Sequence, residues 1–215
     1  MKLWLARHAQ PLIASGICYG VTDVAADEAL TLLAAESLAR VLPPHMLCRV
    51  SPLQRCQQLA SALQQIRPDC LFNSSTYTDT RLAEMDFGHF EGQLWSAIPK
   101  ADVDAWTANF GDHRFGGVES ANDVLHRVAQ ALTDCQACHS QTQALVQQVS
   151  DVLWITHAGV IRAATLIAQG VRCATEASQW PKAAPGFGQW WKTEVGPDGI
   201  NPAAPRCTPP PRPIF

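Results

Sequence analysis

One local pattern occurs twice in this 215-residue chain: a short apolar run, then a histidine, then small residues. The first copy covers residues 3–6 and leads into Arg7 and His8, and the second covers residues 151–156 and leads into His157. Short apolar runs of this kind are typical of strands buried in an α/β sheet. Because ligands of such sheets bind beyond the carboxyl ends of the strands, these three residues are candidate ligand-binding groups.

Strand-like and helix-like segments alternate along the rest of the chain. We predict a strand at residues 47–50, an edge strand at Leu71 and Phe72, and a last strand at residues 187–195. Apolar residues at helical spacing predict helices at residues 31–42, 52–66, 121–138 and 160–168. This alternation indicates the α/β class.

Two further segments carry side chains suited to chemistry. Ser51 and Pro52 fit the N-cap and first position of a helix, which places Arg55 in its first turn and off its apolar face. Residues 82–92 mix carboxylates, aromatics and glycines, and Glu84 in this segment is a candidate proton donor. The loop at residues 11–23 is long and rich in turn residues, as expected for a loop that wraps a ligand.

Composition excludes several classes of protein. The net charge of −3 argues against an electrostatic nucleic-acid binder, and no apolar run approaches the roughly 20 residues of a membrane helix. Arg7 and His8 interrupt the first apolar run, so it does not fit a signal peptide. We therefore expect a cytoplasmic protein with reduced cysteines and neither nucleic-acid nor membrane partners.

Cys135, Cys138 and His139 have the spacing of a c-type haem attachment site. Both cysteines also continue the apolar stripe of the helix predicted at residues 121–138. Ser120 and Asp123, at the start of this helix, have the spacing of a capping box. We interpret them as core residues and predict that the protein uses no cofactor.

We predict one domain at residues 1–195, with short helices and loops at about 95–118 that form a lid. The lid residues Trp95, Trp106 and Phe115 either stack on a ring of the ligand or pack in the core, and the sequence leaves both options open. Residues 196–215 form a proline-rich tail that cannot adopt a helix or a central strand.

If the strands are neighbours, five side chains share one pocket. They are Arg7, His8, Arg55, Glu84 and His157. Two arginines and a protonated histidine would neutralise a phosphate monoester and bind its oxygens, while a neutral imidazole would attack phosphorus. A protonated carboxyl would donate to the departing alkoxide, and no metal is required because the cations supply the electrostatic stabilisation.

Six ordered segments of residues 1–170 resemble the histidine phosphatases, also called the phosphoglycerate-mutase-like superfamily. They are LARHA at 5–9, CYGVTD at 18–23, SPLQR at 51–55, LAEMDFGHFEG at 82–92, GGVES at 116–120 and ITHAGVIR at 155–162. The resemblance implies a three-layer α/β/α sandwich with a mostly parallel central sheet. We also expect no metal or other cofactor, and a small phosphorylated metabolite as ligand.

The resemblance implies a role for each matching residue. His8 would be the phosphorylated nucleophile, and Arg7, Arg55 and His157 would form the phosphate pocket. Glu84 would act first as the acid and then as the base. The remaining expected ligand contacts are Tyr19, Thr22 and the backbone amide of Ala158.

Within the family, MDFGHFEG looks like the phosphatase branch, and the overall pattern is most similar to the alpha-ribazole phosphatases of cobalamin biosynthesis. The family usually has Gly after the first histidine, where this chain has Ala9, so we expect backbone angles there that Ala tolerates. The sequence leaves open a mutase, and also a non-catalytic protein that binds a phosphorylated ligand on the same fold. A monomer and a homodimer both remain possible.

Overall fold

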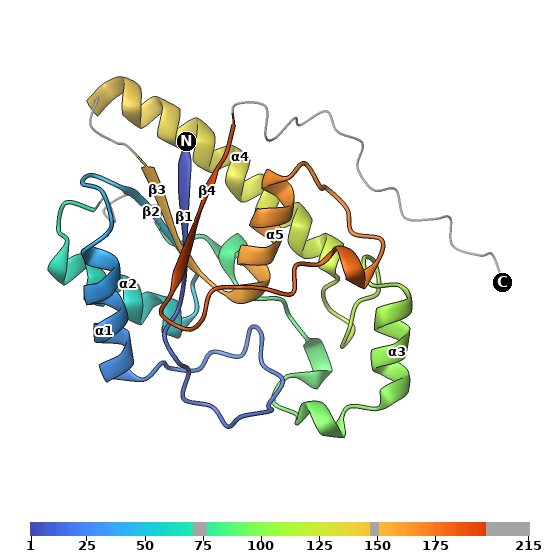
Figure 1. The fold of residues 1–215 in the computed structure, drawn as a ribbon. Helices are drawn as coiled ribbons and strands as arrows, with labels where there is room; N and C mark the ends of the chain where they lie inside the picture. The colour runs from blue at the N-terminus through green and yellow to red at the C-terminus, as the bar shows by residue number, and fades with distance from the viewer. Residues whose placement is uncertain (71–76, 147–150, 197–215) are drawn as a thin grey trace.

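A four-stranded sheet forms the centre of the molecule (Figure 1), and its strand order is β2-β3-β1-β4. The computed structural model describes residues 1–70, 77–146 and 151–196. Strands β1 (Lys2–Arg7), β2 (Leu47–Val50) and β3 (Asp151–Thr156) are parallel, and β4 (Trp190–Glu194) pairs antiparallel with β1. The three parallel strands match the predicted segments, and the last strand is shorter than predicted at both ends.

The register aligns the carboxyl ends of the parallel strands. Arg7 on β1 pairs with Thr156 on β3, and Val50 on β2 pairs with Ile155. The residues that follow these strands therefore emerge together at one edge of the sheet.

Helices cover both faces of the sheet. Side chains alternate along β1, so that Leu3 and Leu5 face one apolar cluster and Trp4 and Ala6 face another. Helices α4 (Ala121–Val146) and α5 (Ala158–Ala168) pack in the first cluster, and α1 (Glu28–Ala39) and α2 (Gln54–Ile66) pack in the second. In Figure 1, α1 and α2 lie to the left of the sheet and α5 lies to its right. The predicted three-layer α/β/α sandwich is confirmed.

Three helices begin elsewhere than predicted, and one of them is α5, which begins at Ala158 rather than Val160. The α1 helix begins at Glu28, because the Asp27 carboxylate accepts a hydrogen bond from Leu30 N at 2.9 Å and so caps the helix. The α2 helix begins at Gln54 with Leu53 as N-cap, so the predicted capping role of Ser51 is wrong. The predicted capping box of α4 is confirmed, since Ser120 and Asp123 each bond the other's backbone N–H.

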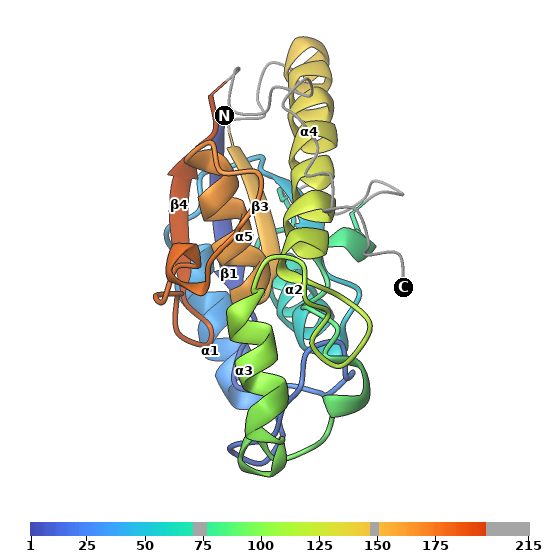
Figure 2. The ribbon, with the colours of Figure 1, turned by 90° about the vertical axis from the view of Figure 1, so that its right-hand side faces the viewer.

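Residues 95–118 contain the 3-10 helix η3 (Trp95–Ala97) and the helix α3 (Lys100–Ala108). Figure 2 places α3 beyond the carboxyl end of the sheet. The Phe115 ring is fully buried and stacks on Trp106, with their centroids 4.4 Å apart. Core packing is thus the correct interpretation of these two aromatics, and closure of this segment as a lid stays a prediction.

Several predictions concern features outside the sheet and helices. Leu71, Phe72 and nearly all of the proline-rich tail lie outside the described residues. The prediction that the cysteines are reduced is wrong for Cys173, which is disulfide-bonded. Cys135 and Cys138 are free thiols within α4. In the described part of the chain, no helix is long and apolar enough to cross a membrane. The cytoplasmic location and the oligomeric state stay predictions.

Candidate active site

His8 follows β1 directly and is almost fully buried. Its Nδ1 lies 2.7 Å from the carbonyl oxygen of Ala9. A carbonyl can only accept, so Nδ1 carries the proton and Nε2 carries the free electron pair. Burial, together with the positive charges of Arg55 and Arg7, lowers the pKa of His8 to about 3. At pH 7 this imidazole is therefore neutral and nucleophilic.

Ala9 adopts a backbone conformation that an L residue tolerates. Among the described residues other than glycine, only His45 has a positive φ. The Ala in place of the usual Gly therefore causes no backbone strain, as predicted.

Arg55 lies in the first turn of α2, but its side chain is fully buried rather than solvated. It crosses to the loop at residues 19–22, where Nη1 donates to Thr22 O at 2.8 Å and Nη2 donates to Gly20 O at 2.6 Å. Its guanidinium also faces the Tyr19 ring, 5.5 Å from the centroid. Helical periodicity placed Arg55 off the apolar face of the helix. Such periodicity gives no sign of a loop that packs over the start of the helix and buries the side chain.

Arg7 ends β1 and contacts the loop before β4. Its Nη1 donates to Pro185 O at 3.1 Å, and its guanidinium carbon lies 3.9 Å from the centroid of the Phe187 ring. The same ring lies 5.5 Å from the His8 ring. Phe187 therefore covers both the arginine and the nucleophile, and it contributes to the desolvation of His8.

His157 follows β3 and is fully buried, with its ring 5.1 Å from that of His8. Its Nε2 lies 2.7 Å from Ser51 Oγ, which also accepts a hydrogen bond from Leu53 N at 3.3 Å, so Ser51 orients this imidazole. Burial and the nearby groups His8 and Arg55 lower the pKa of His157 well below its ordinary value. The neutral form is therefore favoured in this structure, and protonation of His157 against a bound phosphate dianion stays a prediction.

Three buried nitrogens of these side chains lack a hydrogen-bond partner within the described part of the protein: Arg7 Nε, Arg55 Nε and His157 Nδ1. Buried polar groups of native proteins are almost always paired, so unpaired ones call for an explanation. Two cationic donors and an imidazole nitrogen, all next to a neutral nucleophile, suit a tetrahedral oxyanion.

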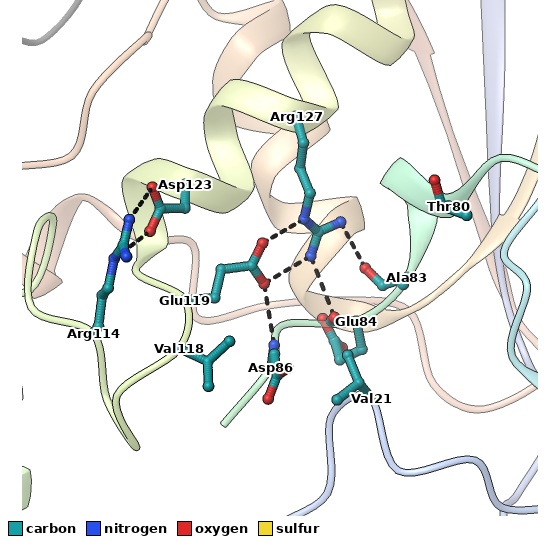
Figure 3. Close-up of a pocket in the computed structure, with 10 residues that line it drawn as sticks. All are labelled: Val21, Thr80, Ala83, Glu84, Asp86, Arg114, Val118, Glu119, Asp123 and Arg127. Carbon is teal, nitrogen blue, oxygen red and sulfur yellow. Dashed lines mark hydrogen bonds and ion pairs between the residues drawn. The ribbon is translucent and has the colours of Figure 1, made fainter. Parts of the chain in front are cut away.

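Glu84 reaches the same edge of the sheet from a segment without regular structure. Its Oε2 accepts a hydrogen bond from Gly159 N at 3.0 Å, in the first turn of α5 beside His157. A Cβ at position 159 would overlap Glu84 Oε1, so glycine allows the close approach. Arg127 on α4 donates to the carbonyls of Ala83, at 2.7 Å, and Glu84, at 3.2 Å (Figure 3), and thereby fixes the backbone that carries the acid.

Glu91 organises the loop at residues 19–22. Its carboxylate accepts backbone hydrogen bonds from Gly20, Val21 and Thr22 at 2.9–3.2 Å, and a further short one from the Thr22 hydroxyl. The hydroxyl of Thr22 thus serves the loop, and the carbonyls of the same loop bind Arg55. The predicted ligand contacts of Tyr19 and Thr22 stay predictions.

Ala158 is the first residue of α5, where backbone N–H groups have no partner within the helix. Its amide thus suits the expected ligand contact, which also stays a prediction. No group of three or more His, Cys, Asp or Glu side chains in the described ranges is arranged to hold a metal.

Four supporting residues were missed by sequence reasoning: Ser51, Glu91, Arg127 and Phe187. Glu91 and Ser51 lie inside quoted motifs, so the motifs themselves offered a signal. Arg127 and Phe187 lie in none of the quoted motifs, and their roles depend on tertiary contacts.

The model of the histidine phosphatase superfamily (branch 1) matches residues 3–182. A Hydrogenobacter thermophilus protein named "Putative phosphoserine phosphatase 2" is 26% identical over 176 residues, which are 79% of each chain. A mycobacterial glucosyl-3-phosphoglycerate phosphatase structure is 21% identical with a TM-score of 0.70, covering 89% of this chain and 88% of that one. The structure of TTHB049 from Thermus thermophilus is 24% identical with a TM-score of 0.59, covering 90% and 94%. Both structures share the fold, and the extent of the family match shows that this chain belongs to the histidine phosphatase superfamily (branch 1).

Proposed function

We propose that this protein is a metal-independent phosphomonoesterase that acts on a small phosphorylated metabolite through a phosphohistidine at His8. The observation that carries the proposal is the set of unpaired buried nitrogens of Arg7, Arg55 and His157 beside a neutral His8. Family membership and the phosphatase names of relatives support the same reaction class.

In the first step, His8 Nε2 attacks phosphorus and the bond from phosphorus to the leaving oxygen breaks. Glu84 gives its proton to that oxygen, so the alcohol leaves neutral. Arg7, Arg55 and His157 stabilise the charge that builds on the phosphoryl oxygens, and the Nδ1–H bond to Ala9 O stabilises the imidazole as it becomes positive.

In the second step, the Glu84 carboxylate takes a proton from water and the water oxygen attacks phosphorus. The bond between phosphorus and His8 Nε2 breaks, and inorganic phosphate leaves. Both steps use the same cationic groups, so no metal is required for charge stabilisation.

Hydrolysis of p-nitrophenyl phosphate in excess EDTA tests this proposal. We expect turnover by the native protein, acid-labile phosphate on a histidine after rapid quenching, and loss of both in His8→Asn. His126→Asn is a matched control, because His126 is exposed on α4. Full activity in His8→Asn, or phosphate trapped on another residue, would contradict the proposal.

A substrate panel addresses the leaving group. Phosphoserine and glucosyl-3-phosphoglycerate appear in the names of relatives, and the sequence pattern predicted alpha-ribazole 5′-phosphate. Phosphoglycerate isomerisation faster than phosphate release would indicate a mutase instead. Tight phosphate binding without turnover would indicate a non-catalytic binding protein.

A further inference from the structure

We infer that the cavity beside Glu84 binds the leaving group, and that its charge favours an alcohol bearing an ammonium or uncharged hydroxyl groups over one bearing a carboxylate. This inference rests on the proposed phosphatase function and names the substrate class. It begins from a cavity of about 380 Å³ that lies between the segment of Glu84, the start of α4 and Val21 (Figure 3).

Glu84 connects the cavity to the phosphate pocket. Glu84 lines the cavity and also bonds Gly159 N, next to His157 of the phosphate pocket. Val21, which also lines the cavity, belongs to the loop whose carbonyls hold Arg55. Because Glu84 must reach the leaving oxygen, the rest of the alcohol extends from the phosphate pocket into this cavity.

Carboxylates outnumber cations in the wall of the cavity. The ionisable lining residues are Glu84, Asp86, Glu119, Asp123, Arg114 and Arg127. Four carboxylates and two guanidiniums give a formal charge of −2 when Glu84 is ionised and −1 when it holds the proton that it donates. An anionic leaving group is therefore repelled in either state.

Arg127 cannot offset this charge for a ligand, because all five of its N–H groups are occupied. Nε and Nη2 donate to Glu119 at 2.6 and 3.1 Å, and the remaining N–H groups donate to backbone carbonyls of Arg81, Ala83 and Glu84. Its charge is also balanced by Glu119.

Arg114 is paired as well, with its Nε 3.1 Å from Asp123 Oδ2 and its Nη2 3.4 Å from Asp123 Oδ1 (Figure 3). Asp86 differs from Glu119 and Asp123, since its carboxylate accepts a hydrogen bond from Gly88 N at 2.7 Å and forms no ion pair with an arginine of the described residues. Asp86 thus contributes a carboxylate charge that no arginine of the cavity balances, and it is the group to change.

Two matched pairs of phosphate esters test the inference. O-phosphoethanolamine carries an ammoniomethyl group where phosphoglycolate carries a carboxylate, and glycerol 3-phosphate carries a hydroxymethyl group where 3-phosphoglycerate carries a carboxylate. One unit charge about 7 Å away in a partly exposed site changes binding roughly tenfold, so we expect kcat/KM ratios of about tenfold or more against each carboxylate. Raising the salt concentration should shrink both ratios.

The same ratios in Asp86→Asn should fall severalfold, because this variant keeps an acceptor for Gly88 N and removes the charge. Each ratio is taken within one variant, so an overall change in activity cancels. Glu28→Gln is the control, since this exposed acid lies in the first turn of α1, on the other face of the sheet, and should leave both ratios unchanged.

Failure of the cavity inference can be distinguished from failure of the phosphatase proposal. If p-nitrophenyl phosphate is not hydrolysed, the phosphatase proposal fails first. If it is hydrolysed through His8 but the carboxylate esters are preferred or equal, only the cavity inference is overturned. If none of the four esters turns over, their inhibition of p-nitrophenyl phosphate hydrolysis replaces kcat/KM, and a lack of inhibition or stronger inhibition by the carboxylates also overturns it.

Discussion

Gly159→Ala should disable the acid while leaving the phosphate pocket intact. Gly159 lies in the first turn of α5, and its N–H bonds Glu84 Oε2 at 3.0 Å. An added Cβ would overlap Glu84 Oε1 and lie 3.1 Å from the carboxyl carbon. Its φ is not in the left-handed region, so the backbone itself accepts Ala.

The size of the effect follows from these contacts. Carbon and oxygen need about 3.5 Å, so the carboxyl must retreat by roughly 1 Å, and a displacement of that size costs about 100-fold in rate. Ala stabilises a helix by about 1 kcal/mol relative to Gly, while the lost bond to a carboxylate costs about 1.5–3 kcal/mol. We therefore expect a folded protein that is destabilised by no more than about 2 kcal/mol.

The assay compares two leaving groups. Nitrophenolate departs without a proton, whereas a simple alkoxide needs one. Since kcat/KM includes only steps up to departure of the alcohol, the later role of Glu84 as base does not enter it. We expect kcat/KM to fall about 100-fold for glycerol 3-phosphate and less than about fivefold for p-nitrophenyl phosphate.

An equal loss with both esters would refute this reasoning, and so would full activity with glycerol 3-phosphate. Glu84→Gln should reproduce the same difference between the esters, because it removes the proton without moving the chain. Gly196→Ala is the matched control, as a Cβ there has no neighbour within 4 Å among the described residues.

Three further changes have defined outcomes. Glu91→Gln removes the charge that holds residues 19–22, so kcat/KM for p-nitrophenyl phosphate should fall roughly tenfold and the melting temperature should also fall. Glu194→Gln, at an exposed position, should change neither quantity. Phe187→Ala admits water to His8, so its pKa should rise from about 3 toward the ordinary value; an unchanged NMR titration of the ring would contradict this. Because the pKa values of His8 and His157 are lowered in the folded protein, the unfolded state binds more protons below about pH 6.5. The free energy of unfolding should therefore fall as the pH drops from about 6.5 toward 3. The slope should reach up to about 1.4 kcal/mol per pH unit for each imidazole. Urea unfolding at several pH values measures this slope, which His8→Asn should reduce by one imidazole's share.

The parts of the site that the sequence predicted are those fixed by strand ends. A parallel sheet brings residues that follow its strands to one edge, so His8 and His157 could be placed together from two apolar runs. Arg55 could be placed near them for the same reason, because it lies in the first turn after β2. None of these inferences required knowledge of a long-range side-chain contact.

The parts that the sequence could not predict depend on such contacts. The burial of Arg55 results from carbonyls of Gly20 and Thr22, more than 30 residues earlier, and a helical periodicity contains no information on them. Ser51 fits an N-cap by residue type, and only the position of His157 after the neighbouring strand β3 shows that the Ser51 hydroxyl also bonds an imidazole. Similarly, the choice between ligand stacking and core packing for Trp106 and Phe115 depended on how the segment folds on itself.

The two halves of the site are held by different kinds of structure, and this has a mechanistic consequence. His8 and His157 are fixed by paired strands, whose ladder of hydrogen bonds leaves their backbone little freedom. Glu84 is fixed instead by side-chain and amide bonds from α4 and α5, chiefly those of Arg127 and Gly159. Substitutions in these supports should therefore change proton donation and leaving-group selectivity while phosphoryl transfer to His8 from activated esters continues. Kinetics that separate the two esters would reveal this division, which a single-substrate assay would miss.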